Sequence, residues 1–244
     1  MIILNDNGNW GRLGNQIFRS IPISILVKKH NLKVKYPAKY LQTIEKLGII
    51  LHYGDKDTQI TKKLNDDNYM SFLNMNNTDH SFELDYCFFQ TKDISDLICN
   101  YIRTTCKDNI IKCNKFKERY NNNNDIFIHI RLGDTINWRI ETNNYIANTI
   151  KLLNYDNIYI ASDTLKHKQI INIQNTFKNV HLIDYNEIDT IHFGTTCKNV
   201  ILSYGTFSAI IGYMAFYSNV YYYNHKSKIC PLEPFIDKGF ISRV

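Results

Sequence analysis

The sequence predicts an α/β protein with two Rossmann-like halves, each built on a parallel sheet, and a cleft between the halves. The chain has 244 residues, of which 44% are hydrophobic, enough for one large core or two small ones. Beyond residue 125, short apolar runs alternate with amphipathic segments, a pattern typical of a parallel sheet covered on both faces. The polar tract 120–125, YNNNND, has no periodicity and is expected to be a connection. We therefore predict one domain at 1–120 and a second at 121–244.

The first half begins with a strand, a glycine-bearing turn and a long helix. The apolar run at residues 2–4 predicts the strand, and a helix is expected from about 14 to 30, capped by Gly14 or Asn15. Pro22 should lie near its first turns or kink it. Further on we predict a strand at 32–37 and helices at 41–51 and 93–107, with no clear period between 52 and 90.

The second half alternates strands and helices. Strands are expected at 126–131, 157–161, 180–183, 199–203 and 219–223, and helices at 142–153, 164–177, 187–197 and 206–217. The carboxyl ends of parallel strands share one edge of the sheet, and ligands bind there in open α/β sheets. Three of these strands end in polar residues: Arg131 with Asp134, Ser162 with Asp163, and Gly-Thr-Phe-Ser at 205–208. Their convergence predicts a site for a nucleotide or a sugar phosphate.

Simpler interpretations stand beside this one. Arg131 is able to pair with Asp134 alone, and Asp163 is able to cap the helix that follows it. The alternation of a strand places His129 and Arg131 on one face, however, and a guanidinium grips two phosphate oxygens at once. Thr206 or Ser208, beside the free N–H groups of a helix start, would form a nest of the size of a phosphate group.

The turn GNWGRLGNQIF at 8–18 is the chemistry-bearing stretch of the first half. It matches neither the dinucleotide-binding glycine motif nor the P-loop. The amides of Asn15 and Gln16 at a helix start suit a hydroxyl-rich ligand, because each amide donates and accepts hydrogen bonds.

Composition excludes several classes of protein. The net charge of +6 is spread along the chain, which mildly favours an anionic ligand and gives no sign of nucleic-acid binding. The six cysteines form no C-x-x-C pair and are expected to be reduced thiols of a cytoplasmic protein. The amino terminus does not resemble a signal peptide, and the apolar stretch 204–223 is too polar for an integral membrane span. Association with a membrane surface is left open.

Three stretches, GRLGNQIF, FIHIRLGD and SYGTFSAIIGYMA, together resemble a known family. In order and rough spacing they are similar to the three motif regions of the α-1,2-fucosyltransferases of glycosyltransferase family 11. They more distantly resemble the α-1,6- and protein O-fucosyltransferases, which share the H-x-R-x-G-D core. The resemblance implies a GT-B architecture, GDP-fucose as donor, a glycan acceptor, inversion at the anomeric carbon, and no required metal or bound cofactor.

The resemblance also implies roles for individual residues. Arg131 would hold the donor pyrophosphate, and His129 would stand beside the sugar or the phosphate. Asp189, with Asp184 as the competing candidate, would hold the guanine edge. The remaining donor-site candidates are Gly14 and Asn15 facing the sugar-bearing cleft, Ser162 and Asp163 at the strand end, and Thr206, Phe207 and Ser208 at the phosphate and base. The general base stays open among His129, Asp134 and Asp6.

Two departures from the family weaken the acceptor side of this interpretation. The family's aromatic-rich sequence after the last motif is AIIGYM here, and the chain is short. We therefore expect acceptor-binding elements to differ, and another deoxyhexose remains open. Other hypotheses are a metal-dependent transferase using Asp55 and Asp57 as a D-x-D motif, a transferase of a different nucleotide sugar, and a sugar- or nucleotide-binding module without catalysis.

Overall fold

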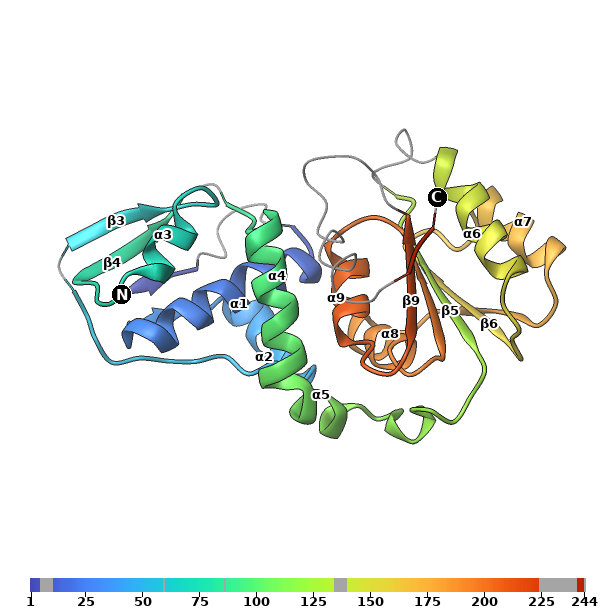
Figure 1. Cartoon of the computed structure of the whole chain (residues 1–244), viewed down its shortest axis with the longest axis horizontal. Coiled ribbons are helices and arrows are strands. Elements are labelled where there is room, and N and C mark those ends of the chain that lie inside the picture. Colours follow the sequence, from blue (N-terminus) through green and yellow to red (C-terminus); the bar gives the residue numbers. More distant parts are fainter. Residues whose placement is uncertain (5–10, 59, 86, 134–139, 224–240, 244) are drawn as a thin grey trace. The chain divides into compact units, whose positions relative to one another are not determined.

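The computed structural model describes residues 1–4, 11–58, 60–85, 87–133, 140–223 and 241–243. The chain divides into two compact units, Met1–Cys113 and Asn114–Val244. Both units contain a parallel sheet with helices (Figure 1). The prediction of an α/β protein with two parallel sheets is confirmed.

The N-terminal unit has a four-stranded sheet in the order β2-β1-β4-β3, with every pair parallel. Its strands are β1 (Ile2–Ile3), β2 (Val34–Lys35), β3 (Ile60–Leu64) and β4 (His80–Leu84). Its helices are α1 (Leu13–His30), α2 (Ala38–Lys46), α3 (Tyr69–Asn74), α4 (Lys92–Tyr101) and α5 (Lys107–Cys113), with a π-helical stretch at Ile102–Cys106. Fourteen of the eighteen residues of α1 are buried, because α2, α3 and α4 all pack against it.

Several local expectations for this unit are wrong. The N-cap of α1 is Arg12, without a side-chain hydrogen bond, so neither Gly14 nor Asn15 caps the helix. Pro22 lies in the middle of α1 and not near its first turns, and the helix continues through it. Helix α2 starts directly after Pro37, three residues earlier than expected, and ends before Gly48, whose φ of 84° no helix accommodates. The segment without clear period holds β3, α3 and β4.

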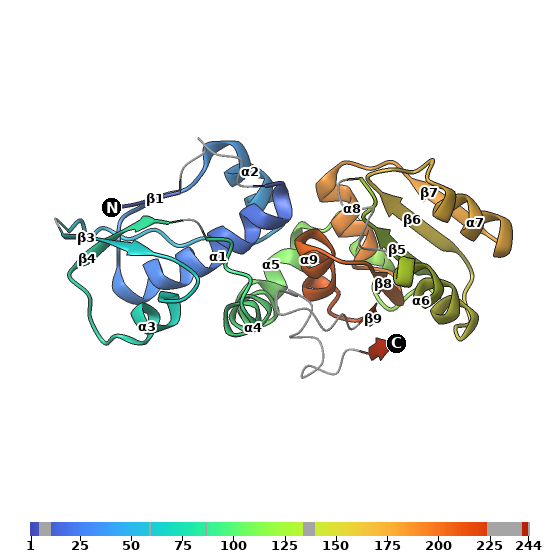
Figure 2. The same cartoon turned by 90° about the horizontal axis from the view of Figure 1, so that it is seen from above.

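The C-terminal unit has a six-stranded parallel sheet in the order β10-β9-β8-β5-β6-β7. Its strands are β5 (Ile126–Ile130), β6 (Ile158–Ser162), β7 (Val180–Ile183), β8 (Asn199–Leu202), β9 (Asn219–Tyr223) and β10 (Ile241–Arg243). Its helices are α6 (Ile140–Lys151), α7 (Lys168–Thr176), α8 (Glu187–Gly194) and α9 (Thr206–Met214). Figure 2 shows α6 and α7 on one side of this sheet and α8 and α9 on the other. Strand β10 was not expected from the sequence.

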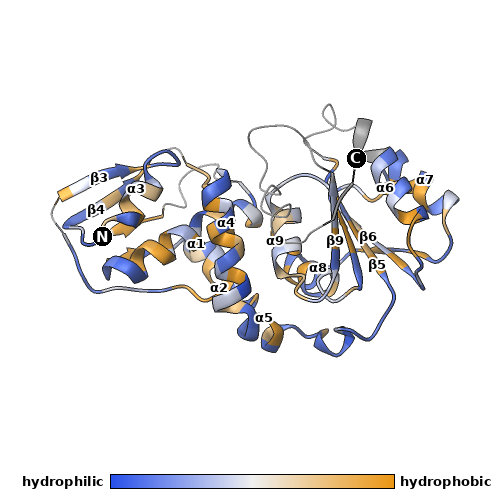
Figure 3. Ribbon diagram, viewed as in Figure 1, coloured by the Kyte–Doolittle hydropathy of each residue, from blue (hydrophilic) through white to orange (hydrophobic). Residues whose placement is uncertain are grey.

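The core of this unit explains why its strands were predictable. All five residues of β5 are buried, and Ile128, Ile160 and Ile201 of neighbouring strands pack in one cluster. Figure 3 shows the same concentration of apolar residues on β5 and β6, and on α1 of the first unit. A strand buried on both faces has a continuous apolar sequence, which stands out from its polar surroundings.

The units divide before the tract 120–125, not within it. Asn114 donates from Nδ2 to the carbonyl oxygen of His192 at 2.9 Å, and Arg119 pairs with Asp125 at 2.6 Å between Nη2 and Oδ2. The Arg119 guanidinium also lies 4.6 Å from the ring centroid of Phe193. Residues 114–125 therefore belong to the C-terminal unit, since these contacts hold them against its body.

The five cysteines within the described residues have free thiols, and four of them are buried. Among the helices that the structure describes, none has the length and apolar character needed to cross a bilayer.

Candidate functional site

The order of the second sheet reverses between β5 and β8. From β5 the chain adds β6 and β7 on one side, and from β8 it adds β9 and β10 on the other. This is the strand order of the dinucleotide-binding Rossmann fold, in which ligands bind outside the carboxyl ends of the strands at the reversal. The residues that follow β5 and β8 therefore meet at the position where such a sheet binds ligands.

Arg131 and Gly205 are the residues in contact there. A Cβ built on Gly205 would lie 3.2 Å from Nη1 and 3.6 Å from Cδ of Arg131, so the arginine side chain lies over this glycine. The main-chain N–H of Arg131 donates to Oγ of Ser203 at 3.0 Å, and Ser203 is buried. The hydrogen bond to Ser203 thus fixes the backbone of Arg131, from which the side chain extends. The Arg131 guanidinium lies against the turn after β8.

Gly205 is also the N-cap of α9, where no side-chain cap forms. Its φ of 108° and ψ of 163° belong to a region that is essentially restricted to glycine. An α-helix leaves its first amides without intrahelical acceptors, and this end carries partial positive charge. The turn therefore brings a guanidinium and a helix amino terminus together, and both favour an anion.

His129 lies beneath the same helix start. Its Nδ1 is 2.6 Å from Oγ of Ser208, and its ring centroid is 5.0 Å from that of Phe207. His129 is 8% exposed and Ser208 is fully buried. The bond joins β5 to α9, so His129 orients the helix start, and a role as general base would have to use Nε2.

Asp163 does not cap a helix. Helix α7 begins at Lys168, with His167 as N-cap, so the capping interpretation is wrong. The Asp163 carboxylate instead accepts from the main-chain N–H of Leu132 at 2.7 Å and of Gly133 at 3.1 and 3.2 Å. It therefore holds the turn that follows Arg131.

Ser162, at the end of β6, forms a local turn. Its Oγ accepts from the N–H of Thr164 at 3.1 Å. Strand register pairs Ser162 with Ile130, next to Arg131, so it belongs to the same edge of the sheet.

Asp189 and Asp184 differ in their surroundings. Asp189 lies in the first turn of α8, where its Oδ2 pairs with Nζ of Lys115 at 2.7 Å and accepts from Nδ2 of Asn186 at 2.9 Å. Asp184 follows β7 directly and is exposed. The Asp184 side chain is thus the more exposed of the two, whereas the Asp189 carboxylate is engaged by Lys115 and Asn186.

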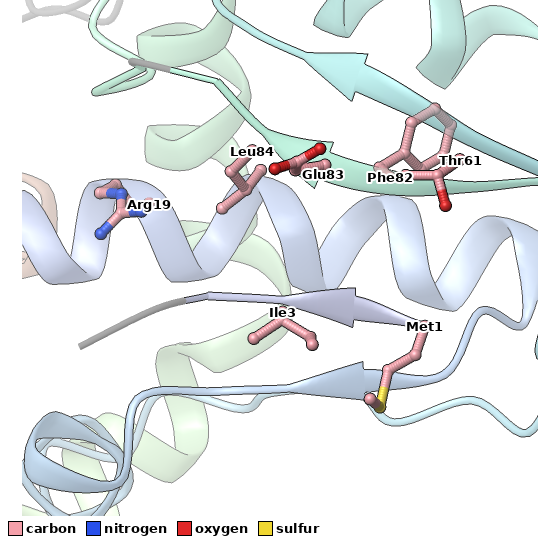
Figure 4. A pocket seen from close by; sticks show the side chains of 7 residues that line it. All are labelled: Met1, Ile3, Arg19, Thr61, Phe82, Glu83 and Leu84. Carbon is pink, nitrogen blue, oxygen red and sulfur yellow. The ribbon is translucent and has the colours of Figure 1, made fainter. Parts of the chain in front are cut away.

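In the N-terminal unit, Gly14 is buried in the first turn of α1, whereas the next residue, Asn15, is partly exposed. A separate cavity of about 300 Å³ lies in the same unit, between β1 and β4 and beside α1 (Figure 4). Its lining is Met1, Ile3, Arg19, Thr61, Phe82, Glu83 and Leu84. None of the residues singled out from the sequence lines it.

One residue of the site at β5 and β8, Ser203, was not singled out from the sequence. Its only signal was its place inside the stretch SYGTFSAIIGYMA. Asp134 and Asp6, two candidates for a general base, lie outside the described residues.

The alternative D-x-D motif lies just before β3. Asp57 pairs through Oδ1 with the amino group of Met1 at 2.7 Å, and Asp55 is exposed. Within the described parts of the chain, no three His, Cys, Asp or Glu side chains gather closely enough to hold a metal ion.

No protein-family model matches the sequence, and a search of curated proteins finds no match either. Among solved structures, the chain is similar to NodZ α-1,6-fucosyltransferase co-crystallized with GDP, with 14% identity, a TM-score of 0.38, and coverage of 61% of this chain and 55% of that chain. NodZ soaked with GDP-fucose gives 13% identity, a TM-score of 0.35 and coverage of 57% and 52%. A mutant of Arabidopsis thaliana FUT1 in complex with GDP gives 10% identity, a TM-score of 0.48 and coverage of 93% and 71%. The match thus spans about half the length of the NodZ chains.

Proposed function

We propose that the protein is an inverting glycosyltransferase with a GT-B architecture that moves L-fucose, or a related deoxyhexose, from GDP-fucose to a hydroxyl of a glycan acceptor. The observation that carries the proposal is the contact of the Arg131 side chain with Gly205 at the start of α9. The two residues come from FIHIRLGD and SYGTFSAIIGYMA, two of the stretches that resemble the fucosyltransferases. The contact lies where the sheet order reverses, at the usual place for a nucleotide.

The proposed reaction is a direct displacement. The acceptor oxygen attacks the anomeric carbon, the bond from that carbon to the diphosphate oxygen breaks, and GDP leaves with the electron pair. The acceptor proton passes to a general base. Arg131 and the amides at the start of α9 stabilise the charge that grows on the leaving diphosphate.

The other residues of the edge have supporting roles in this proposal. Asp163 holds the turn that carries Arg131, and the bond between His129 and Ser208 orients the start of α9. Thr206 and Phe207 stand at the phosphates and the base. Asp184, which is exposed, is the better placed acceptor for the N–H groups of guanine, and Asp189 is the second choice.

Three finer assignments depend on the motif resemblance alone: an α-1,2 linkage, a galactoside acceptor bound by the N-terminal unit, and catalysis without a metal. A cytoplasmic location depends on the cysteines and the amino-terminal sequence. Analysis of the linkage in the product, and turnover measured with and without a chelator, would test the first and third assignments.

Nucleotide specificity is the first test of the proposal. Thermal unfolding is measured with GDP, UDP, CDP and their sugars, because a ligand that binds only the folded state raises the Tm. GDP and GDP-fucose should raise the Tm, and stabilisation by UDP but not by GDP would contradict the donor assignment.

Removal of the Arg131 guanidinium is the second test. Arg131→Ala should cost about 3 kcal/mol in kcat/KM, on the order of 100-fold. Arg131→Lys should recover part of this loss, since it keeps the charge but not the planar fork. Lys166→Ala, an exposed charge in the neighbouring loop, is the matched control and should leave turnover unchanged. Near-normal turnover of GDP-fucose by Arg131→Ala would refute the role of this arginine.

A further inference from the structure

Two side-chain amides meet in the N-terminal unit. Nε2 of Gln90, in the loop after β4, donates to Oδ1 of Asn15, in the first turn of α1, at 3.4 Å. Both residues are partly exposed and thus accessible to a ligand. Gln90 takes no part in the proposed displacement.

The position of Asn15 is set by the turn before α1. Gly11 has a φ of 82°, and a Cβ built on it would lie 2.2 Å from Nδ2 of Asn15. Nε2 of Gln16 donates to the carbonyl oxygen of Gly11 at 3.4 Å. Any side chain at position 11 would displace the Asn15 amide, so the glycine of GRLGNQ serves to place this asparagine.

The position of Gln90 is set by strain in the residue before it. Phe89 has a φ of 54°, an unusual value for a bulky side chain, and such a residue costs on the order of 1–3 kcal/mol. Its main-chain N–H donates to Oδ1 of Asp66 at 2.6 Å, and the N–H of Phe88 donates to Oδ2 at 3.4 Å. The Phe89 ring is buried, with its centroid 5.3 Å from that of Tyr69. The carboxylate and the buried ring together hold the strained loop in one conformation.

One residue that lines the cavity, Arg19, lies one helical turn from Asn15. Arg19 is four residues after Asn15 on α1, and residues with this spacing lie on the same face, one turn apart. Arg19 lines the cavity of about 300 Å³, at the end where Leu84 of β4 also lies (Figure 4). The loop that carries Gln90 follows β4, so the amide pair lies toward the end of the cavity that Arg19 and Leu84 line, whereas Met1 and Thr61 line its other end.

We propose that Asn15 and Gln90 form a binding site for two neighbouring hydroxyls of the acceptor sugar, and that Asp66 is the positioning residue of this site. An amide side chain both donates and accepts hydrogen bonds, as a sugar hydroxyl does. A site held by a strained backbone and a partly buried carboxylate is preorganised, so little conformational freedom is lost when the sugar binds. The inference depends on the proposed function and assigns acceptor recognition to named residues of the N-terminal unit.

The test compares the KM for the acceptor with the KM for GDP-fucose. Gln90→Ala should raise the KM for the acceptor about tenfold, the loss expected for about 1.4 kcal/mol of binding free energy, with the KM for GDP-fucose unchanged within about twofold. Gln42→Ala, an exposed glutamine on α2, is the matched control and should change neither constant. An unchanged acceptor KM, or a rise in the donor KM alone, would overturn the assignment while transfer by the wild type still supports the proposed function.

Asp66→Asn tests positioning separately. In the free protein it should move the side-chain amide NMR signals of Gln90 and Asn15, whereas Asp67→Asn, at the exposed neighbouring residue, should leave them in place. If Asp66→Asn leaves both signals where they were, Asp66 does not position the pair.

A binding experiment separates this inference from the proposed reaction. If the wild type transfers no sugar to any acceptor, the proposed function fails, and the wild type is then titrated with methyl β-D-galactopyranoside. Shifts confined to the side-chain amides of Asn15 and Gln90 would support the site, and an unchanged spectrum would refute it.

Discussion

Substitution of Gly205 by alanine tests whether the start of α9 and the Arg131 guanidinium act as one anion site. The substitution has two separate consequences. The backbone at φ 108° and ψ 163° becomes strained for any residue with a Cβ, and the new methyl group lies 3.2 Å from Nη1 of Arg131.

The two consequences differ in size and in what they affect. Backbone strain of this kind costs about 1–3 kcal/mol of the free energy of unfolding, and 2 kcal/mol lowers the Tm of a chain of this size by roughly 4–8 °C. The guanidinium is the far end of a flexible side chain, so it moves by a few tenths of an ångström rather than resisting. We expect this shift to weaken GDP binding about tenfold, or about 1.4 kcal/mol.

The assay is calorimetric titration of GDP into the wild type, Gly205→Ala, Arg131→Ala and the double variant. If the methyl group acts through the guanidinium, the double variant should bind GDP no more weakly than Arg131→Ala alone. Ala209→Gly, in the same helix, serves as the control. It lowers stability by about 1–2 kcal/mol, through helix propensity and the loss of a buried methyl group, but adds nothing near Arg131. Its GDP affinity should equal that of the wild type.

Two results would refute the reasoning. The first is wild-type GDP affinity in Gly205→Ala, which would mean that the anion does not bind at this turn. The second is a tenfold loss that persists in the Arg131→Ala background, which would mean that the methyl group meets the ligand directly and that the two groups are independent.

Two further predictions concern carboxylates that act on the backbone. Asp163→Ala removes the acceptor of two main-chain N–H groups after β5 and should weaken GDP binding about tenfold. Asp163→Asn should lose less GDP affinity, and the control Asp156→Ala, at an exposed site, should lose none. Titration of GDP measures the affinity of all three variants. Equal affinity of Asp163→Ala and the wild type would exclude the role assigned to this carboxylate. Burial raises the pKa of Asp66 above its ordinary value of 3.8, so the folded protein binds this proton more tightly than the unfolded chain does. The free energy of unfolding should therefore fall as the pH rises from 3.8 through the pKa of the folded state, and Asp66→Asn should remove that part of the slope in denaturant titrations across pH. An identical slope in the variant would show that Asp66 does not contribute it.

The sequence by itself determined most of the second half of the fold. Strand β5 is buried on both faces, and its run of apolar residues marked it without ambiguity. Successive side chains of a strand point to opposite faces, and this placed His129 and Arg131 on one face. The glycine and hydroxyl residues at 205–208 marked the start of α9. These features are local, because each depends only on residues a few positions apart.

The sequence failed where the signal depended on distant contacts. Strand β3 has one buried residue among five, so its sequence shows no alternation of apolar and polar residues. It forms because it pairs with β4 along its whole length. The boundary between the units lies before Asn114 because that residue and Arg119 bond to parts of the chain some 80 residues away. No pattern of neighbouring residues in the sequence predicts contacts at this separation.

The tertiary structure alone decided which candidate residues lie together and what they contact. Pairing of β5 with β8 brought Arg131 to Gly205, although 74 residues separate them in the sequence. The sequence position of Asp163 is that of a helix cap, but its carboxylate stabilises the turn after β5, because two main-chain N–H groups of that turn donate to it. Local sequence thus specified which residue types stand at the strand ends. The order of the strands, which depends on how the whole sheet packs, decided which of them meet.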